Sequence, residues 1–296
     1  MFRNKTTLKL LAVLAGILLT AAACGDASGG SEAAAQAADG AVDLQVRPFS
    51  EIQASDFVFE ADPFDPNRGI FRVTTTEESI CTIVWGETED FGNFNNSLEM
   101  NGTGIIDHNV FLPGAEQGKE YFFRVQGFTS DGRIFASETG TFTIPVVEDS
   151  GDATGGGAEM AVHGDNLALG ATVVDVSSEF SDTWKAANAI DGDPSTEWAT
   201  AGDGDDGYIT IDLGSPQDVV GVEFITRSMA NGTAITDEFT ITVDDGQTFG
   251  PFPAGNPRDP RFAAVEFTGQ VIRFDVANST GGNVGAVEVN VFAPAG

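Results

Sequence analysis

The segment NAIDGDPSTEW, residues 188–198, decides how the C-terminal half of this chain is interpreted. It places three acids, a glycine, a proline and two hydroxyl residues in front of a tryptophan. Gly192 and Pro194 favour a compact reversal, while Asp191, Asp193 and Thr196 supply oxygens at short spacing. Such a loop suits Ca²⁺, which takes about six to eight oxygen ligands. The EF-hand pattern is not met, and the alternative is an ion-free turn in which Asp side chains cap backbone N–H groups.

The sequence on both sides of this segment indicates a known type of β-sandwich. The run NLALGATVVDVSSEFSDTWKAANAIDGDPSTEWAT (166–200) is followed by YITIDLG (208–214), and the chain nearly ends with VGAVEVNVF (284–292). Together they resemble the factor V/VIII type C (discoidin) family, which includes the galactose-binding modules of bacterial glycosidases. The resemblance implies a jelly-roll sandwich over residues 165–296, with ligand-binding loops at one end.

The resemblance also implies a structural Ca²⁺ site. Its ligands are the carbonyls of Asn188 and Asp193, the carboxylate of Asp191, both oxygens of Thr196, the carbonyl of Val287 and the carboxylate of Glu288. Such an ion links the beginning of the domain to its last strand. No disulfide does so, because this domain has no cysteine.

Sugar binding needs an aromatic face for the ring and polar groups for its hydroxyls. In the galactose-binding relatives an acid, an arginine and an asparagine hold the sugar, and their counterparts here are Glu179, Arg227 and Asn231. Trp184 or Phe180 offers a stacking face. Those relatives have a histidine after the tryptophan, whereas Ala199 follows Trp198 here. Two interpretations stay open: a glycan site, or a degenerate one in which Trp184 anchors its loop and Arg227 pairs with an acid.

Two further features of this half have simpler interpretations. Trp198 is expected at the start of a strand and in the core. The acidic run AGDGDDGY, residues 201–208, is expected to be a solvated loop rather than a second cation site.

The preceding part, residues 47–146, is also predicted to be a β-sandwich, because short Val, Ile, Thr and Phe runs alternate with turn signals. Its run HNVFLPG (108–114), Tyr121 and the turn SDG (130–132) resemble the fibronectin type III-like domain found at the N-terminus of purple acid phosphatases. The resemblance implies a tyrosine corner at Tyr121. His108 is expected to be packed in the sandwich, and the domain to serve as a spacer or interaction module. The fold class is therefore all-β, with two sandwiches.

The N-terminus has the features of an exported lipoprotein. Residues 1–23 combine a basic start, an apolar run and small residues, which is typical of a secretory signal. The end LTAAAC resembles the bacterial lipobox and implies that Cys24 carries the lipid. Residues 24–46 are a predicted flexible tether and residues 147–164 a Gly-rich linker. Cys81, left without a partner, is expected to behave as a small buried hydrophobe.

Composition restricts the function. Forty-five acids against 14 bases give a net charge of -31, which opposes binding to nucleic acid and to anionic membrane surfaces. Two histidines and no nucleophile motif argue against an enzyme. The sequence predicts a lipid-anchored bacterial surface protein, outside the cell, that binds extracellular glycan for adhesion or capture. The alternative is a non-catalytic structural lipoprotein that docks other envelope proteins.

Overall fold

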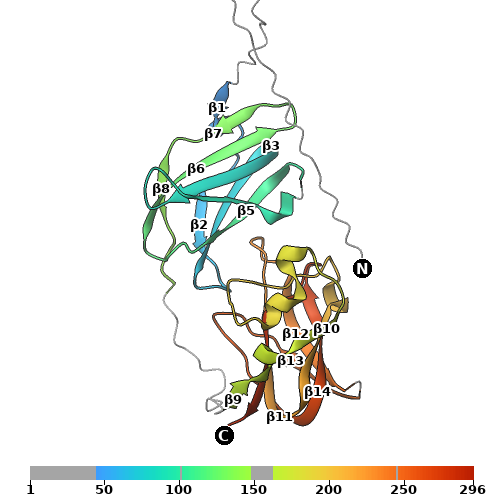
Figure 1. The fold of residues 1–296 in the computed structure, drawn as a ribbon. Coiled ribbons are helices and arrows are strands. Elements are labelled where there is room, and N and C mark those ends of the chain that lie inside the picture. Colours follow the sequence, from blue (N-terminus) through green and yellow to red (C-terminus); the bar gives the residue numbers. More distant parts are fainter. Residues whose placement is uncertain (1–44, 101, 148–162, 245) are drawn as a thin grey trace, which may run out of the picture. The chain divides into compact units, whose positions relative to one another are not determined.

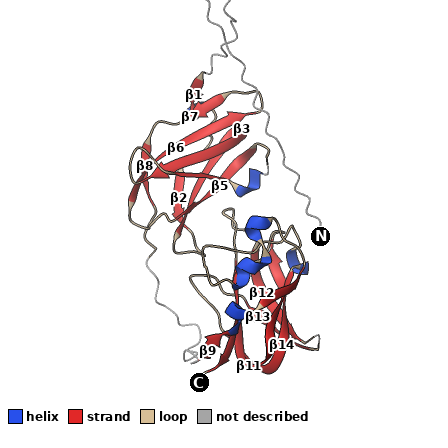
Figure 2. Ribbon diagram, in the orientation of Figure 1, coloured by secondary structure: helices blue, strands red, loops and turns tan. Residues whose placement is uncertain are grey.

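A computed structural model describes residues 45–100, 102–147, 163–244 and 246–296, and strands dominate it (Figures 1 and 2). The strands form two sheets, one from residues before the linker and one from residues after it. The all-β prediction is therefore confirmed. No helix among the described residues is long and apolar enough to span a membrane. The predicted signal sequence, Cys24 and most of the predicted tether and linker lie outside the described residues.

The first sandwich contains eight strands and two short 3-10 helices. These are β1 (Val46–Pro48), η1 (Phe49–Glu51), β2 (Val58–Ala61), β3 (Arg68–Gly86), β4 (Asn93–Asn96), η2 (Leu98–Met100), β5 (Ile105–Pro113), β6 (Glu120–Thr129), β7 (Ile134–Ala136) and β8 (Gly140–Thr143). The first half of β3 pairs with β2 and β5, and its second half pairs with β4 and β6. A register shift between Thr74 and Ser79 marks the change, so one strand serves both layers (Figure 1).

Aromatic residues fill the core of the first sandwich, including Phe71, Trp85 and Phe135. The Tyr121 hydroxyl accepts a hydrogen bond from the Glu116 backbone N–H at 2.9 Å, as expected for a tyrosine corner. Cys81 and His108 are each 1% exposed, which confirms that both are buried.

The second sandwich contains seven strands and four short 3-10 helices. These are β9 (His163–Asn166), η3 (Leu167–Gly170), β10 (Thr172–Val176), η4 (Asp182–Trp184), η5 (Ala186–Ile190), η6 (Gly204–Asp206), β11 (Tyr208–Thr226), β12 (Ile235–Val243), β13 (Gln247–Pro253), β14 (Ala263–Thr280) and β15 (Ala286–Pro294). The strand order is β13-β12-β14-β11-β15-β9, and β10 pairs with β11. Apart from β9 and β10, the segment before Tyr208 consists of loops and 3-10 turns, and these carry the candidate site.

Two details of the second sandwich differ from the expectations. Trp198 is fully buried as predicted, but it lies outside any strand, with its backbone N–H donating to Ala286 O at 2.8 Å. β9 begins at His163, inside the range expected for the linker, because the His163 ring packs 3.9 Å from the Phe292 ring on β15. A polar, Gly-rich sequence did not signal this strand, since its pairing partner lies at the other end of the domain.

Candidate functional site

The loop after η5 curls around its own aspartates. Gly192 has φ of 75°, a left-handed conformation that favours glycine and reverses the chain. The Asp191 carboxylate accepts from Asp193 N through Oδ1 and from the Thr196 hydroxyl through Oδ2, both at 2.9 Å. Thr196 N also donates to Asp193 O at 3.0 Å. These bonds bring three of the predicted ligand residues together.

Glu288 reaches this loop from β15. It is 9% exposed, and neither of its carboxylate oxygens has a hydrogen-bond partner. Burial first, and then the nearby Asp191 and Asp193 charges, raise the pKa of the Glu288 carboxyl to about 7, while the Gly192 backbone N–H opposes the shift. A buried carboxylate that faces two others, with only the Gly192 N–H to offset their charge, is an arrangement that a cation stabilises.

The side chain of Asp193 already has other partners. Its Oδ1 accepts from the Ser195 N–H at 2.9 Å and from the Ser195 hydroxyl at 2.6 Å, and these bonds lower the pKa of the carboxyl. The main-chain carbonyl of Asp193, which is the predicted ligand, accepts from the Thr196 N–H at 3.0 Å and from the Thr196 hydroxyl at 3.2 Å. Across the described residues, no cluster of three or more His, Cys, Asp or Glu side chains forms a metal site. The predicted site does not need one, because carbonyl and hydroxyl oxygens make up most of its donors, and this set suits Ca²⁺.

Asn188 connects this loop to its neighbours. Its side chain is buried, and its Nδ2 donates to Thr183 O and to Glu197 O, both at 2.9 Å. Val287, the remaining predicted ligand, is buried directly before Glu288 on β15. The structure therefore brings all six predicted ion ligands to the loop or to the strand segment that reaches it.

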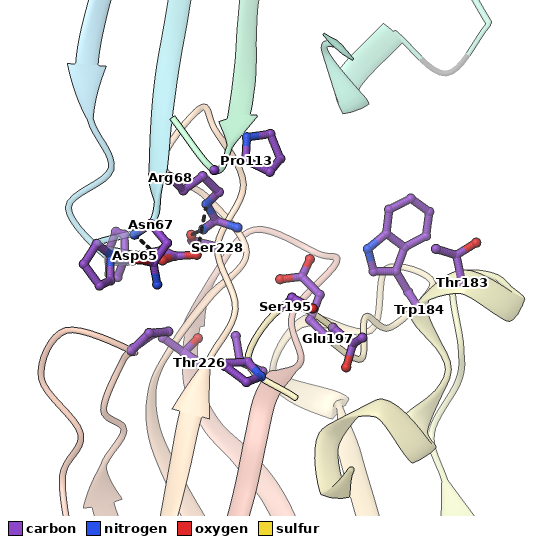
Figure 3. Close-up of a pocket in the computed structure, with 17 residues that line it drawn as sticks. Asp65, Asn67, Arg68, Pro113, Thr183, Trp184, Ser195, Glu197, Thr226 and Ser228 are labelled. Atoms are coloured by element: carbon purple, nitrogen blue, oxygen red, sulfur yellow. Dashed lines mark hydrogen bonds and ion pairs between the residues drawn. The ribbon is translucent and has the colours of Figure 1, made fainter. Parts of the chain in front are cut away.

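The two candidate stacking residues form an aromatic pair. The Phe180 and Trp184 rings lie 5.6 Å apart at 80°, and Phe180 is 49% exposed. Phe180 N donates to Ala199 O at 2.8 Å, and Ala199 N donates to Trp184 O at 3.2 Å. Ala199, the position that departs from the galactose-binding pattern, thus holds the loop that carries both rings. Figure 3 shows Thr183 and Trp184 on this loop, near Ser195 and Glu197.

The predicted polar sugar ligands all have structural partners. Glu179 Oε1 accepts from Ala186 N at 2.7 Å, at the start of η5. Asn231 Oδ1 accepts from the Thr233 N–H and hydroxyl, which closes a turn. Glu179 is exposed at the surface beside Phe180, so one candidate acid does lie next to the aromatic pair.

Arg227 is buried rather than open to a ligand. It is 3% exposed, and its Nε and Nη2 donate to Glu197 Oε1 at 3.0 and 2.8 Å. Its Nη1 donates to the backbone carbonyl of Asn283. This pairing with an acid is the predicted alternative for Arg227, in which the sugar site is degenerate.

Comparison with known protein families identifies the second sandwich. Residues 173–289 match the model of the F5/8 type C domain. No curated protein matches the chain. Among solved structures, a chitosan-binding module of a Paenibacillus chitosanase/glucanase is 27% identical, over 44% of this chain and 100% of that one, with a TM-score of 0.36. A family 32 module of C. perfringens NanJ, solved with galactose, is 19% identical over 43% and 97% of the two chains, with a TM-score of 0.37. The chain spans 27% of a Ruminococcus gnavus GH29 fucosidase, at 26% identity and a TM-score of 0.35.

Two residues that organise this F5/8 type C domain were not predicted from the sequence. Glu197 is the partner of Arg227, and the Asn188 side chain connects the ion loop to Thr183 and Glu197. Glu197 directly precedes the buried Trp198, and this adjacency was the available signal. No local pattern indicated the side-chain contacts of Asn188, because only the folded loops bring Thr183 O and Glu197 O to its amide.

Proposed function

We propose that the F5/8 type C domain is a Ca²⁺-stabilised glycan-binding module. The observation that carries the proposal is the Phe180–Trp184 pair, an accessible aromatic surface held by Ala199 and bordered by the Glu179 carboxylate. An aromatic surface beside a carboxylate offers both the apolar contact and the hydrogen bonding that a sugar ring needs. Glycan-binding modules among similar structures agree with this assignment but do not identify the sugar.

The ion has a structural role in this proposal. The Asp191, Thr196 and Glu288 oxygens and the Asn188, Asp193 and Val287 carbonyls would hold it, and Ca²⁺ would neutralise the facing carboxylates. Asn188 transmits the effect, because it is hydrogen-bonded to Thr183, next to Trp184. In this proposal, Asn188 orients the aromatic pair through Thr183, and the ion holds the loop after η5 in its folded conformation.

The experiment is a glycan-array and titration study of residues 25–296, which contain the compact unit Leu44–Gly296. We expect Trp184→Ala to weaken binding of the best glycan by about tenfold or more, the loss of one stacking contact. Val174→Ala, also on the second sandwich and 52% exposed, is the matched control and should bind normally. If no glycan binds the wild type, or if Trp184→Ala binds as the wild type does, the proposal fails.

A second candidate function is a non-catalytic envelope protein whose sugar site is degenerate. The burial of Arg227 against Glu197 and the alanine at position 199 favour it, because both remove polar groups from the sugar surface. Under this alternative the array is blank, and a crosslinking pull-down from the native envelope recovers a protein partner.

We further propose that the protein is exported and anchored outside the bacterial membrane through a lipid on Cys24. The support is the sequence of residues 1–24 alone. Metabolic labelling with a radioactive fatty acid should mark the wild type and not the Cys24→Ser variant. Equal labelling of both would disprove the anchor.

A further inference from the structure

The first sandwich has a sheet face that lies opposite its core. Along β3, Cys81, Ile83 and Trp85 point into the core, so Ile80, Thr82 and Val84 point the other way. The register extends this face across β4, β6 and β7, because Val84 pairs with Phe94 and Arg124, and Ile80 pairs with Phe128. We call it the Phe94/Phe128 face (strands β3 and β6 in Figure 1).

The Phe94/Phe128 face is largely apolar. Its apolar members are Ile80, Val84, Phe94, Phe122, Phe128 and Ile134. Phe94 is 64% exposed, Phe128 39% and Ile80 38%, so three large side chains contact water on one surface. Contiguous exposed apolar residues of this kind mark interaction surfaces more often than isolated ones do.

The charges on this face differ from those of the rest of the chain. Its central strand positions are Thr82, Asn96, Arg124, Gln126 and Ala136, and none of these is acidic. The acids of this face are Glu78 on β3 and Glu120 on β6, which lie at its ends. Aromatic residues with an arginine and without acids form the composition typical of the centre of a protein–protein interface.

Two polar atoms on the face have no partner. Arg124 donates through Nη2 to the Thr139 hydroxyl at 2.8 Å, but its Nε is buried and without a hydrogen bond. The Thr82 hydroxyl in the middle of the face is also buried and unpaired. Both atoms are covered by the chain's own side chains, so they describe the packing of this face and not a contact with a partner.

We propose that the occupant of the Phe94/Phe128 face is the same face of a second copy of this chain. Two copies with a net charge of -31 each repel one another wherever acids meet. At the centre of this face, between Ile80 and Val84 of β3, no strand position is acidic, so apolar burial there is not opposed by local acid–acid repulsion. A chain this acidic therefore has, among its described strand surfaces, a place suited to self-association.

The pattern of the face is self-complementary. Phe94 on β4 pairs with Val84 of β3, and Phe128 on β6 pairs with Ile80 of β3, so the two rings are two strands and four residues apart. Strand geometry then places them about 16 Å from each other on a diagonal centred near Thr82. A two-fold axis that crosses this diagonal at Thr82 brings Phe94 of each copy onto Phe128 of the other. Each copy then contributes both halves of the contact, as isologous dimers require.

The size of the face predicts a weak dimer. β4 and β7 have four and three residues, so with the facing parts of β3 and β6 the four strands cover roughly 300 Å² per copy. This is less than half of the area of about 800 Å² that a stable interface buries on each partner. We expect a dissociation constant of about 10 µM to 1 mM in solution. If the chain is anchored as proposed above, confinement to a membrane raises the local concentration and favours the dimer.

Sedimentation equilibrium of residues 25–296, up to about 1 mM chain, tests the proposal. We expect a concentration-dependent dimer that strengthens when salt rises from about 50 to about 500 mM, because screening weakens the like-charge repulsion. Phe94→Ser and Phe128→Ser should each raise the dissociation constant at least about tenfold. Phe180→Ser removes a phenyl ring that is 49% exposed on the other sandwich and should leave the dimer unchanged.

A wild type that stays monomeric throughout, or a dimer that survives both face variants, overturns the proposal. Melting temperatures show whether the variants are folded. Engineered cysteines test the orientation: Phe94→Cys mixed with Phe128→Cys should form a mixed disulfide dimer far faster than either variant alone. Crosslinking of each variant mainly with itself would exclude the proposed two-fold arrangement. Cys81 does not interfere, because it is buried.

Discussion

At the scale of single residues, Glu288 offers the most direct test of the ion proposal. Its carboxyl has a pKa raised to about 7 from an ordinary 4.5, chiefly by burial and then by Asp191 and Asp193. Because the pKa of this carboxyl is raised in the folded state, Glu288 contributes fully to the free energy of unfolding of the ion-free domain below about pH 4.5. This contribution is lost as the pH rises through about 7. A bound cation would reverse this pH dependence, because it stabilises the charged form of the Glu288 carboxyl.

We predict that Glu288→Gln stabilises the ion-free protein at pH 7.5 and abolishes its response to Ca²⁺. The amide removes a buried charge repelled by two aspartates, and we expect a gain of roughly 1–2 kcal/mol after allowing for solvent screening. Urea unfolding with EDTA and with Ca²⁺ provides the measurement.

The matched control is Glu266→Gln, which neutralises an exposed glutamate on β14. It should unfold like the wild type and keep the Ca²⁺ response. A wild type whose stability is the same with EDTA and with Ca²⁺ would show that the loop holds no such ion.

At the scale of elements, the ion loop and the aromatic loop are joined by one side chain. Asn188 donates to carbonyls on both sides, at Thr183 and at Glu197. Glu197 in turn holds Arg227, so three loops of the F5/8 type C domain depend on the same amide. Through this connection, the proposed ion would affect the position of Trp184.

We predict that Asn188→Asp separates the two loops. A carboxylate in place of the amide faces two carbonyl oxygens, leaves both without a donor and costs about 3 kcal/mol. Trp184 should then become mobile, with weaker glycan binding and faster proteolysis within 177–198. Asn278→Asp, a change on the exposed surface of β14, introduces the same charge and should have neither effect. Normal glycan affinity in Asn188→Asp would show that the loops are independent.

At the scale of the whole molecule, the two sandwiches contain titrating groups of opposite sense. Burial lowers the pKa of His108 to about 4 from an ordinary 6.5, partly offset by Asp107. Thr75 and Ser79 hydroxyls face its Nε2 and carry no charge. Neutral His108 therefore contributes fully to the free energy of unfolding of the first sandwich above about pH 6.5. This contribution is lost as the pH falls through about 4.

We predict that acidification from pH 7.5 to 4.5 without Ca²⁺ weakens the first sandwich and strengthens the second, since Glu288 has the opposite dependence. Urea unfolding followed by methyl NMR signals of Ile83 and Ile211, which lie in the two cores, reports each sandwich separately. His108→Gln should remove most of the acid sensitivity of Ile83 and leave Ile211 unchanged. Parallel loss of both signals on acidification would contradict the prediction.

The sequence alone was enough for the fold class and for several local features. Alternating Val, Ile and Phe runs predicted strands because side chains of a strand alternate between its faces. The positions of Trp198, Cys81 and His108 in the cores and the Tyr121 bond to Glu116 followed from local pattern and motif. The predicted ion ligands, from Asn188 to Glu288, rest on resemblance to a family and stay a prediction; the structure places these residues in η5, in the loop after it and on β15.

Only the tertiary structure decided which polar groups are already paired. The sequence predicts Arg227 as a sugar ligand, whereas the structure buries it against Glu197. The sequence predicts only the carbonyl of Asn188 as a ligand, whereas the structure also shows its side-chain amide donating to Glu197 O. The Phe94/Phe128 face could not be predicted from the sequence either, since its members come from four strands. The physical reason is the same in each case. Strand periodicity and turn chemistry act between near neighbours in the sequence, whereas burial, ion pairing and surface composition depend on residues that only folding brings side by side.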